Sequence, residues 1–305
     1  MGAPAQAAVV AGEGRTAVEH TVHERYLRAF AAGVEDLSTP LFDLDSPGGI
    51  VAHPVYPVCL EWPLVLAGPP ALGLDDDAVH AGLHVSHEIV WTRPIRPGDA
   101  LRTTMRVETL EQRSAGVLAV FAFATTVAEN GEPVVESHQG VLYRGSTLGA
   151  EAIGSAAHPA LRSAPAAPID TAASRPSAPV PSEPAGEVAA FEVGPADAVV
   201  YSECSGIWNP IHTDPRAARA AGLPHPVLHG TATLARTISA VVHSRLGGDP
   251  TRLTRLSCRF TAPVAAGDEA TVAASELHDG ALAFTIYKDG GVPVLVGTVS
   301  SGAAG

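Results

Sequence analysis

Residues 201–230 hold the groups best suited to acid–base chemistry in this chain. The stretch reads YSECSGIWNPIHTDPRAARAAGLPHPVLHG. His212 follows an Asn209-Pro210 turn, and Gly230 stands directly before an apolar helical pattern. An imidazole exchanges protons near neutral pH, and an amide at the start of a helix stabilises negative charge. This pairing predicts proton transfer on a substrate whose transition state carries charge on a carbonyl oxygen.

The segment SGIWNPIH at 205–212 resembles the signature of the MaoC-like hydratases and dehydratases, also called the hydratase 2 family. The family pattern is Ser-Gly-Asp-x-Asn-Pro-x-His, and its members add or remove water at the C2–C3 bond of acyl thioesters. The resemblance implies that His212 is the acid–base residue and that the Gly230 amide holds the thioester oxygen. It also implies that Asn209 orients water or the histidine, and that Pro210 fixes the turn.

Ile207 stands where the family carries its acid. An alkyl group can neither share the reacting water nor transfer a proton, and general acid–base help is worth about 10²–10⁴-fold. His212 could act alone as base and then acid, or another group could replace the carboxylate, or the chain could perform different chemistry or only bind. The nearest replacement groups are Tyr201, Ser202, Glu203 and Asp214.

Several residues around the motif are expected to contact the substrate. Ile207 and Trp208 make the site apolar, which predicts a lowered pKa for His212. Tyr201 is also expected to contact the substrate, because it lies at the start of the same stretch. For Arg255 and Arg259 two interpretations stay open: a solvated edge strand, or contact with the phosphates of coenzyme A or of a carrier-protein arm.

Other polar residues have structural interpretations. Asp214 precedes Pro215 and fits the N-cap of a short helix. His229 resembles the family's buried structural histidine. His84, His87 and Glu88 lie close together without an evident third ligand, so we expect no metal site. No dinucleotide fingerprint is present, so we expect no cofactor beyond the thioester carrier.

Composition narrows the class of protein. The net charge of −13 and the pI near 5.4 argue against a nucleic-acid binder. The three cysteines are far apart and form no framework, which favours a reducing, cytoplasmic compartment. No apolar run reaches the length of a membrane span, and the first residues lack the basic region of a signal peptide. The expected partner is acyl-CoA or acyl carrier protein; further pairing into a homodimer stays open.

An internal sequence repeat indicates that the chain consists of two related halves. Residues 91–99, WTRPIRPGD, match residues 260–268, FTAPVAAGD, at an offset of 169. We expect a flexible tail over 1–14, a degenerate first domain over 15–146, an Ala/Pro/Ser-rich linker over 147–187 and a domain with the active site over 188–305. Matching Pro40 to Pro210 puts Phe42 in the place of His212, so the first domain lacks the base.

The hydrophobic patterns predict an α+β fold. Turn signals separate strand-like segments over 101–110, 116–129, 133–143, 270–277, 281–288 and 293–300. A helical pattern covers 231–246, whereas prolines 57 and 63 would interrupt the matching helix near 55–66. The resemblance implies a double hotdog: two antiparallel sheets, each wrapped around a central helix and joined edge to edge, as an internalised dimer.

The favoured function is a hydratase or dehydratase acting on 3-hydroxyacyl and trans-2-enoyl thioesters in fatty acid or polyketide metabolism. One alternative is isomerisation or cyclisation of a thioester or polyketide-like chain at the same site, because an apolar residue at 207 suits a reaction that excludes water. The other is an acyl-thioester-binding subunit without catalysis.

Overall fold

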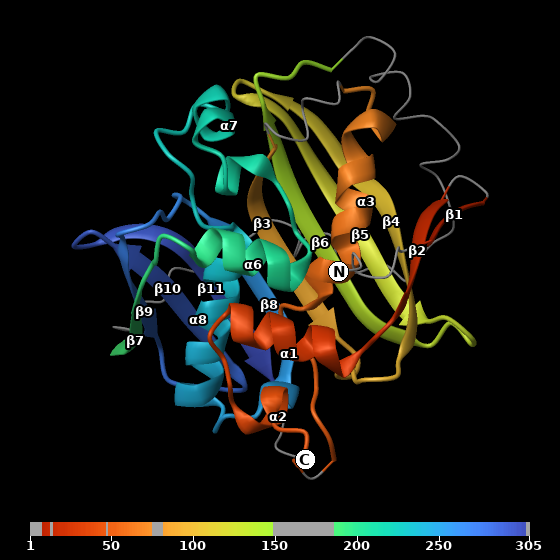
Figure 1. The fold of residues 1–305 in the computed structure, drawn as a ribbon, viewed down its shortest axis with the longest axis vertical. Helices are drawn as coiled ribbons and strands as arrows, with labels where there is room; N and C mark the ends of the chain where they lie inside the picture. Colours follow the sequence, from red (N-terminus) through yellow and green to blue (C-terminus); the bar gives the residue numbers. More distant parts are fainter. Residues whose placement is uncertain (1–7, 13–14, 47, 75–81, 149–185, 303–305) are drawn as a thin grey trace.

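The strands pair into a single antiparallel sheet (Figure 1). The computed structural model describes residues 8–12, 15–46, 48–74, 82–148 and 186–302. Across this part of the chain the strand order is β1-β2-β4-β5-β6-β3-β8-β11-β10-β9-β7. The strands are β1 (Ala8–Gly12), β2 (Arg15–Thr21), β3 (Gly82–Trp91), β4 (Ala100–Arg113), β5 (Gly116–Val127), β6 (Pro133–Arg144), β7 (Gly186–Glu192), β8 (Leu253–Phe260), β9 (Glu269–Ala274), β10 (Ala281–Lys288) and β11 (Val292–Ser301).

The two expected sheets join edge to edge, as the resemblance implied, and so form one continuous sheet rather than two. β3 of the first half pairs antiparallel with β8 of the second half, in register from Ser86↔Arg259 to Val90↔Arg255. The backbone hydrogen bonds of the two halves therefore form one ladder of eleven strands. Pairing satisfies the two edges that would otherwise expose open amides and carbonyls. The six predicted strands are confirmed, each within a few residues of its expected limits.

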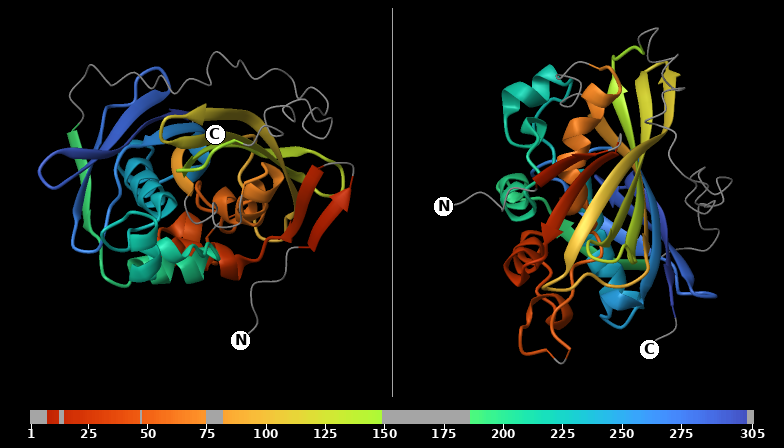
Figure 2. Two further views of the ribbon diagram at one scale, coloured as in Figure 1. Left: turned by 90° about the horizontal axis from the view of Figure 1, so that it is seen from above. Right: turned by 90° about the vertical axis from the view of Figure 1, so that its right-hand side faces the viewer.

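All the helices lie on one side of this curved sheet (Figure 2). α3 contacts β2 and β4 in the first half, and α8 contacts β7 and β9 in the second. The short helices α1 and α6 pack against each other between them. The helices are α1 (Glu24–Gly33), α2 (Thr39–Phe42), α3 (Pro57–Ala71), α6 (Asp197–Ser205), η3 (Pro210–His212), α7 (Pro215–Ala220), α8 (Gly230–Arg245) and η4 (Pro250–Arg252).

α3 is continuous, contrary to the expectation that its prolines would break it. Pro57 is the first helical residue, where its missing N–H would have no partner in any case. Pro63 lies inside the helix and removes one hydrogen bond there. Packing of the buried side chains of Val58, Leu60 and Leu64 offsets this loss.

The two halves repeat the same local structure. Gly98 and Gly267 both adopt φ 89, a left-handed conformation that glycine reaches without steric cost. Their amides donate to the carbonyl oxygens of Val22 and Val193, each at 2.8 Å. The sequence repeat therefore corresponds to a repeated turn. This turn is hydrogen-bonded to Val22, directly after β2, in the first half and to Val193, directly after β7, in the second.

Further hydrogen bonds extend this match toward the long helices. The Ala52 amide donates to the Ile95 carbonyl at 2.8 Å, and the Leu228 amide donates to the Val264 carbonyl at 2.7 Å. The residues that follow correspond accordingly: His53 matches His229, and Pro54 matches Gly230. The first half therefore has no amide hydrogen where Gly230 offers one.

The sequence predicts a flexible tail over residues 1–14 and a linker over residues 147–187. Ala8–Gly12 forms a strand that pairs with β2, so this part of the expected tail is ordered in the sheet. Residues 149–185 lie outside the described residues, so the linker stays a prediction. None of the helices in the described ranges is long and apolar enough to cross a bilayer.

One hydrophobic core runs through both halves and includes α8. Ile238 is fully buried in this core, whereas Val199 on α6 is 44% exposed. We expect Ile238→Ala to lower the free energy of unfolding by about 2–5 kcal/mol, because it removes buried methyl groups and leaves a cavity. Chemical denaturation measures this, with Val199→Ala as control at under about 0.5 kcal/mol. Equal effects of the two substitutions would contradict the assignment of α8 to the core.

Candidate active site

The chain reverses direction directly after α6. Gly206 ends that helix in the left-handed conformation, with φ 73. The Ser205 hydroxyl donates to the Tyr201 carbonyl at 2.6 Å and accepts the Ile207 amide at 3.2 Å. Ile207 is consequently held with its side chain buried against the core and lining a cavity.

Asn209 and Pro210 then build the turn that presents His212. The Asn209 side-chain oxygen accepts the Ile211 amide at 3.3 Å and so caps η3, and Pro210 occupies the first position of this short helix. Asp214 caps α7 in the same way, through the Arg216 amide at 2.7 Å, as predicted. The two caps fix the backbone on both sides of His212.

His212 is held in one tautomer by a backbone carbonyl. Its Nδ1 lies 2.8 Å from the Val227 oxygen, an acceptor, so Nδ1 carries the proton and donates it. Nε2 is then left with a free lone pair beside the cavity that His212 lines. This is the state that a general base requires.

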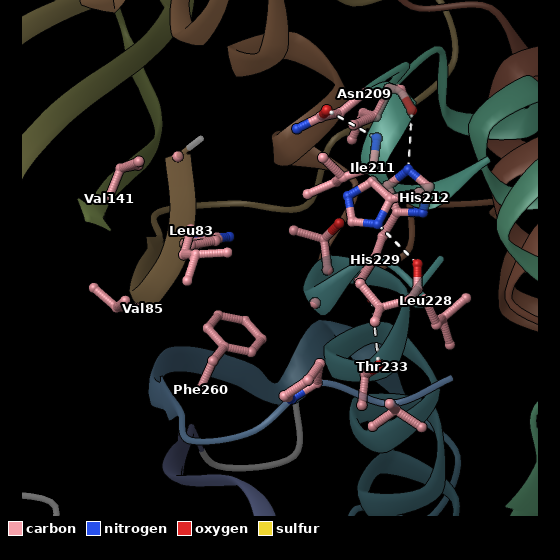
Figure 3. A pocket seen from close by; sticks show the side chains of 18 of the residues that line it. Leu83, Val85, Val141, Asn209, Ile211, His212, Leu228, His229, Thr233 and Phe260 are labelled. Atoms are coloured by element: carbon pink, nitrogen blue, oxygen red, sulfur yellow. Dashed lines mark hydrogen bonds between the residues drawn. The ribbon is translucent and has the colours of Figure 1, made fainter. Parts of the chain in front are cut away.

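His229 stacks on His212 and has a structural role consistent with its interpretation from sequence. The two ring centroids are 3.7 Å apart (Figure 3). His229 Nε2 lies 3.1 Å from the Ile207 carbonyl oxygen and 3.2 Å from the Ser202 hydroxyl. The ring therefore connects α6 and the Ile207 turn to the start of α8, and its flat face supports the imidazole of His212.

Gly230 is the first residue of α8 and lines the same cavity as His212. Within the described part of the chain, the Gly230 amide donates to no backbone carbonyl, as befits the first turn of a helix. A Cβ at this position would lie 3.1 Å from Cε1 of Phe260. A side chain at position 230 would therefore crowd the phenyl ring of Phe260.

The cavity has a volume of about 380 Å³ and draws its walls from both halves. Figure 3 shows Asn209, His212 and His229 on one wall, with Leu83 and Val85 of β3 across from them and Phe260 below. The first half contributes Val58, Trp62, Val65, Gly82, Leu83, His84, Val85, Gln139, Val141, Tyr143 and Arg144. Most of these side chains are apolar, so the first half supplies a binding wall, as we expect for a domain without the base.

The replacement acids considered from sequence do not line this cavity. Ser202 donates to the Ala198 carbonyl, and Glu203 is exposed on α6. Asp214 is paired with Arg216. Among the described residues that line the cavity, none is an aspartate or glutamate. Of the two histidines beside Gly230 in this cavity, His229 has its Nε2 within hydrogen-bond distance of the Ile207 carbonyl and the Ser202 hydroxyl, which leaves His212 as the candidate for proton transfer.

Four of the predicted substrate-binding residues lie away from the cavity. Tyr201 is fully buried behind it and donates its hydroxyl to Thr231 at 2.9 Å. Trp208 is 44% exposed and points out of the turn. Arg255 and Arg259 alternate with the buried Leu256 and Cys258, so they lie on the sheet face opposite the helices.

The edge-strand interpretation of β8 is wrong, because β8 lies between β3 and β11. Arg255 forms an ion pair with Glu88 on the neighbouring strand. Sequence reasoning missed two cationic or polar lining residues of the first half, Arg144 and His84. No local pattern distinguishes them, because their place in the cavity depends on the pairing of β3 with β6 and β8.

Burial lowers the pKa of His212 from 6.5 to about 4, and the hydrogen bond to Val227 acts in the opposite direction. His212 should therefore stay neutral from pH 5 to 8, with the proton on Nδ1. Long-range ¹H–¹⁵N correlation spectra of the imidazole nitrogens measure this, with His212→Gln used to assign the signals. A titration midpoint near 6.5, or a proton on Nε2 at pH 7, would contradict this arrangement.

The sequence matches two models of known protein families. Residues 166–296 match a family model described as a MaoC like domain, and residues 9–137 match one described as a FAS1-like, dehydratase domain region. The chain therefore carries a MaoC-like dehydratase domain preceded by a FAS1-like dehydratase region.

Curated relatives share shorter stretches with the chain. It is 42% identical over 74 residues to enoyl-CoA hydratase 2, peroxisomal, of Arabidopsis thaliana, an alignment that covers 24% of each protein. It is 27% identical over 209 residues to 3-hydroxyacyl-thioester dehydratase X of Mycobacterium tuberculosis, covering 68% of this chain and 64% of that one. The aligned part thus spans a quarter to under two thirds of these relatives.

Solved structures match almost the whole chain. A MaoC-like dehydratase from Phytophthora capsici superposes with a TM-score of 0.74 at 23% identity, covering 95% of this chain and 96% of that one. A Mycobacterium tuberculosis protein described as having a double hotdog fold superposes with a TM-score of 0.56 at 15% identity, covering 93% and 94%. At these identities the likeness shows the fold: an antiparallel sheet with helices on one side, as in double hotdog proteins.

Proposed function

We propose that this protein is a hydratase or dehydratase that adds water to trans-2-enoyl thioesters or removes it from 3-hydroxyacyl thioesters. The observation that carries the proposal is the free Nε2 of His212 in the same cavity as the Gly230 amide. The relatives named as an enoyl-CoA hydratase and a 3-hydroxyacyl-thioester dehydratase support this class of reaction. A role in fatty acid or polyketide metabolism follows from the substrate class.

In this mechanism the thioester carbonyl oxygen accepts a hydrogen bond from the Gly230 amide, where the start of α8 also favours negative charge. His212 Nε2 takes a proton from water as its oxygen bonds to C3, and the C2–C3 π electrons move to form an enolate. The imidazolium then returns its proton to C2. Water has been added across the double bond and His212 is neutral again; dehydration is the reverse.

His212 acts alone in both proton transfers. A single base on one face of the substrate delivers the hydroxyl and the proton to the same face, which makes the addition syn. Ile207 contributes by keeping the imidazole in apolar surroundings, which preserves its neutral form. The cost is the loss of a second proton-transferring group, worth about 10²–10⁴-fold in rate.

The acyl group is carried as a thioester of coenzyme A or of an acyl carrier protein. Both carriers present a phosphate-bearing arm, and Arg144 of β6 lines the cavity with a guanidinium suited to a phosphate. Arg144 takes this role in place of Arg255 and Arg259, which lie on the other face of the sheet.

A second candidate is isomerisation or cyclisation of a thioester at the same site. It is favoured by the absence of aspartate and glutamate among the described cavity-lining residues and by the alkyl group of Ile207. Product analysis separates the two: hydration raises the product mass by that of one water, and isomerisation leaves it unchanged.

We expect His212→Ala to reduce kcat/KM for short and medium trans-2-enoyl-CoA by at least about 10³-fold, because it removes both proton transfers. Loss of the enoyl absorbance measures turnover. His225→Ala, an exposed histidine 13 positions further along, is the matched control and should retain activity. Turnover that survives His212→Ala would overturn the assigned base.

We expect Ile207→Asp to raise kcat/KM by about 10-fold or more, because a carboxylate at 207 would share the reacting water with His212. Ile207→Asn, of the same shape without the proton-transferring group, should not raise it. The enoyl-absorbance assay on both variants checks the comparison, with thermal unfolding to verify that each is folded. A gain in both variants, or in neither, would contradict a missing acid at this position.

A further inference from the structure

A buried polar cluster lies in the first half, beside the cavity but away from His212. It consists of five side chains on α3, β3 and β6: Glu61, His84, His87, Ser137 and Gln139. Two of its members, His84 and Gln139, line the cavity. The proposed hydration mechanism uses none of them.

Glu61 is the innermost member of the cluster. It projects from α3, is 1% exposed, and its two oxygens accept hydrogen bonds from the Ser137 hydroxyl and the Gln139 amide. Burial raises the pKa of this carboxyl to about 7, although both hydrogen bonds favour its ionised form. Each oxygen of the Glu61 carboxyl thus accepts one hydrogen bond from a side chain on β6.

His87 lies between this carboxyl and His84 at the cavity wall, and neither of its buried ring nitrogens has a hydrogen-bond partner among the described residues. His87 Nε2 lies 3.9 Å from Glu61 Oε2, and the rings of His87 and His84 are 5.0 Å apart. A β-bulge between His84 and Ser86 puts both histidines on the helix-facing side of β3, opposite Val141 and Gln139. Within the described residues, the buried Nε2 of His84 has no hydrogen-bond partner.

The second half has the same fold without this cluster. The repeated strand pairs match His87↔Gln139 with Leu256↔Val299, and His84↔Val141 with Leu253↔Ser301 at an equivalent bulge. Ser137 corresponds to Gly297 by the same register. Counting from the matched His53 and His229, Glu61 corresponds to Thr237. The first half thus has ionisable groups where the second has Leu253, Leu256 and Thr237.

This internal comparison separates fold from function. The same architecture has leucine, valine, glycine and threonine at these positions, so the fold does not require a carboxyl and two imidazoles there. Burying polar groups weakens folding unless they are fully hydrogen-bonded, and His84 Nε2 is not. A ligand that hydrogen-bonds to His84 accounts for an arrangement that packing alone would not favour.

Phe260 fixes where along a substrate that hydrogen bond would fall. Its ring lies against Gly230 on one side and 4.8 Å from the His84 ring on the other. In the proposed binding mode, with the thioester oxygen at the Gly230 amide and C3 near His212, the acyl chain runs past Phe260 toward His84. The polar contact therefore falls on the chain beyond C3.

We propose that this site selects acyl thioesters that carry a hydroxyl or carbonyl oxygen beyond C3, and that His84, whose ring packs beside those of His87 and Phe260, binds that oxygen. This inference rests on the proposed function for the orientation of the thioester. A chain of plain methylenes would leave His84 Nε2 desolvated and unpaired. Sites built around a substrate hydrogen bond reject analogues that lack it.

The test compares trans-2-octenoyl-CoA with analogues that bear one hydroxyl at C5, C6 or C7. We expect the best hydroxylated substrate to exceed the plain one in kcat/KM by about 10-fold or more. His84→Leu copies the residue at the matched position of the second half, which keeps the variant compatible with the fold. It should abolish or reverse the ratio of kcat/KM values between the hydroxylated and the plain chain.

Calorimetric binding of the saturated analogues, octanoyl-CoA and its 5-, 6- and 7-hydroxy forms, tests the same preference without turnover. A preference in binding without hydration would refute the proposed function and support the polar subsite. Equal loss of kcat for plain and hydroxylated chains in His84→Leu, with the preference unchanged, would overturn the subsite in favour of proton transfer. Wild-type preference for the plain chain, or no binding of either, would overturn it as well.

Discussion

The hydrogen bond from His212 Nδ1 to the Val227 carbonyl is the interaction on which the site depends. It fixes the tautomer that leaves Nε2 basic, and it does so only if residue 227 is held still. The Leu228 amide is anchored to the Val264 carbonyl in the turn after β8, and an isolated bridge pairs Val227 with Ala265. The chemistry of one imidazole therefore rests on a turn of the sheet and on the strand that leads into it.

Duplication explains how this arrangement divides labour. Both halves keep the repeated turn and a histidine at the matched positions 53 and 229. Matching Pro40 to Pro210 puts Phe42 at the position of His212, and Pro54 matches Gly230, so by this alignment the first half lacks both the imidazole and the amide hydrogen. The α3, β3 and β6 elements of the first half line the cavity. The pairing of β3 with β8 places them next to the second half.

Desolvation is the common physical theme of the two histidine groups. Burial lowers the pKa of both His212 and His84 to about 4, so each imidazole is neutral at pH 7 and available for hydrogen bonds or proton transfer. The buried side chain of Ile207 lines the same cavity as His212. The low dielectric that favours neutral imidazoles also strengthens any hydrogen bond that a substrate makes there.

The sequence by itself determined the local features: the Asn209-Pro210 turn before His212, Gly230 at a helix start, the strands and the repeated turn. Each depends on residues within a few positions of one another, which propensity and capping chemistry control. The tertiary structure alone decided that β3 and β8 are the strands that join the two halves, that Arg255 and Arg259 face away from the cavity, and that His84 and His87 share a face. The alternation of residues along a strand fixes which face of the sheet each side chain occupies, and a β-bulge reverses that alternation. Only the long-range pairing of β3 with β6 and β8 decides which parts of the two halves line the cavity together.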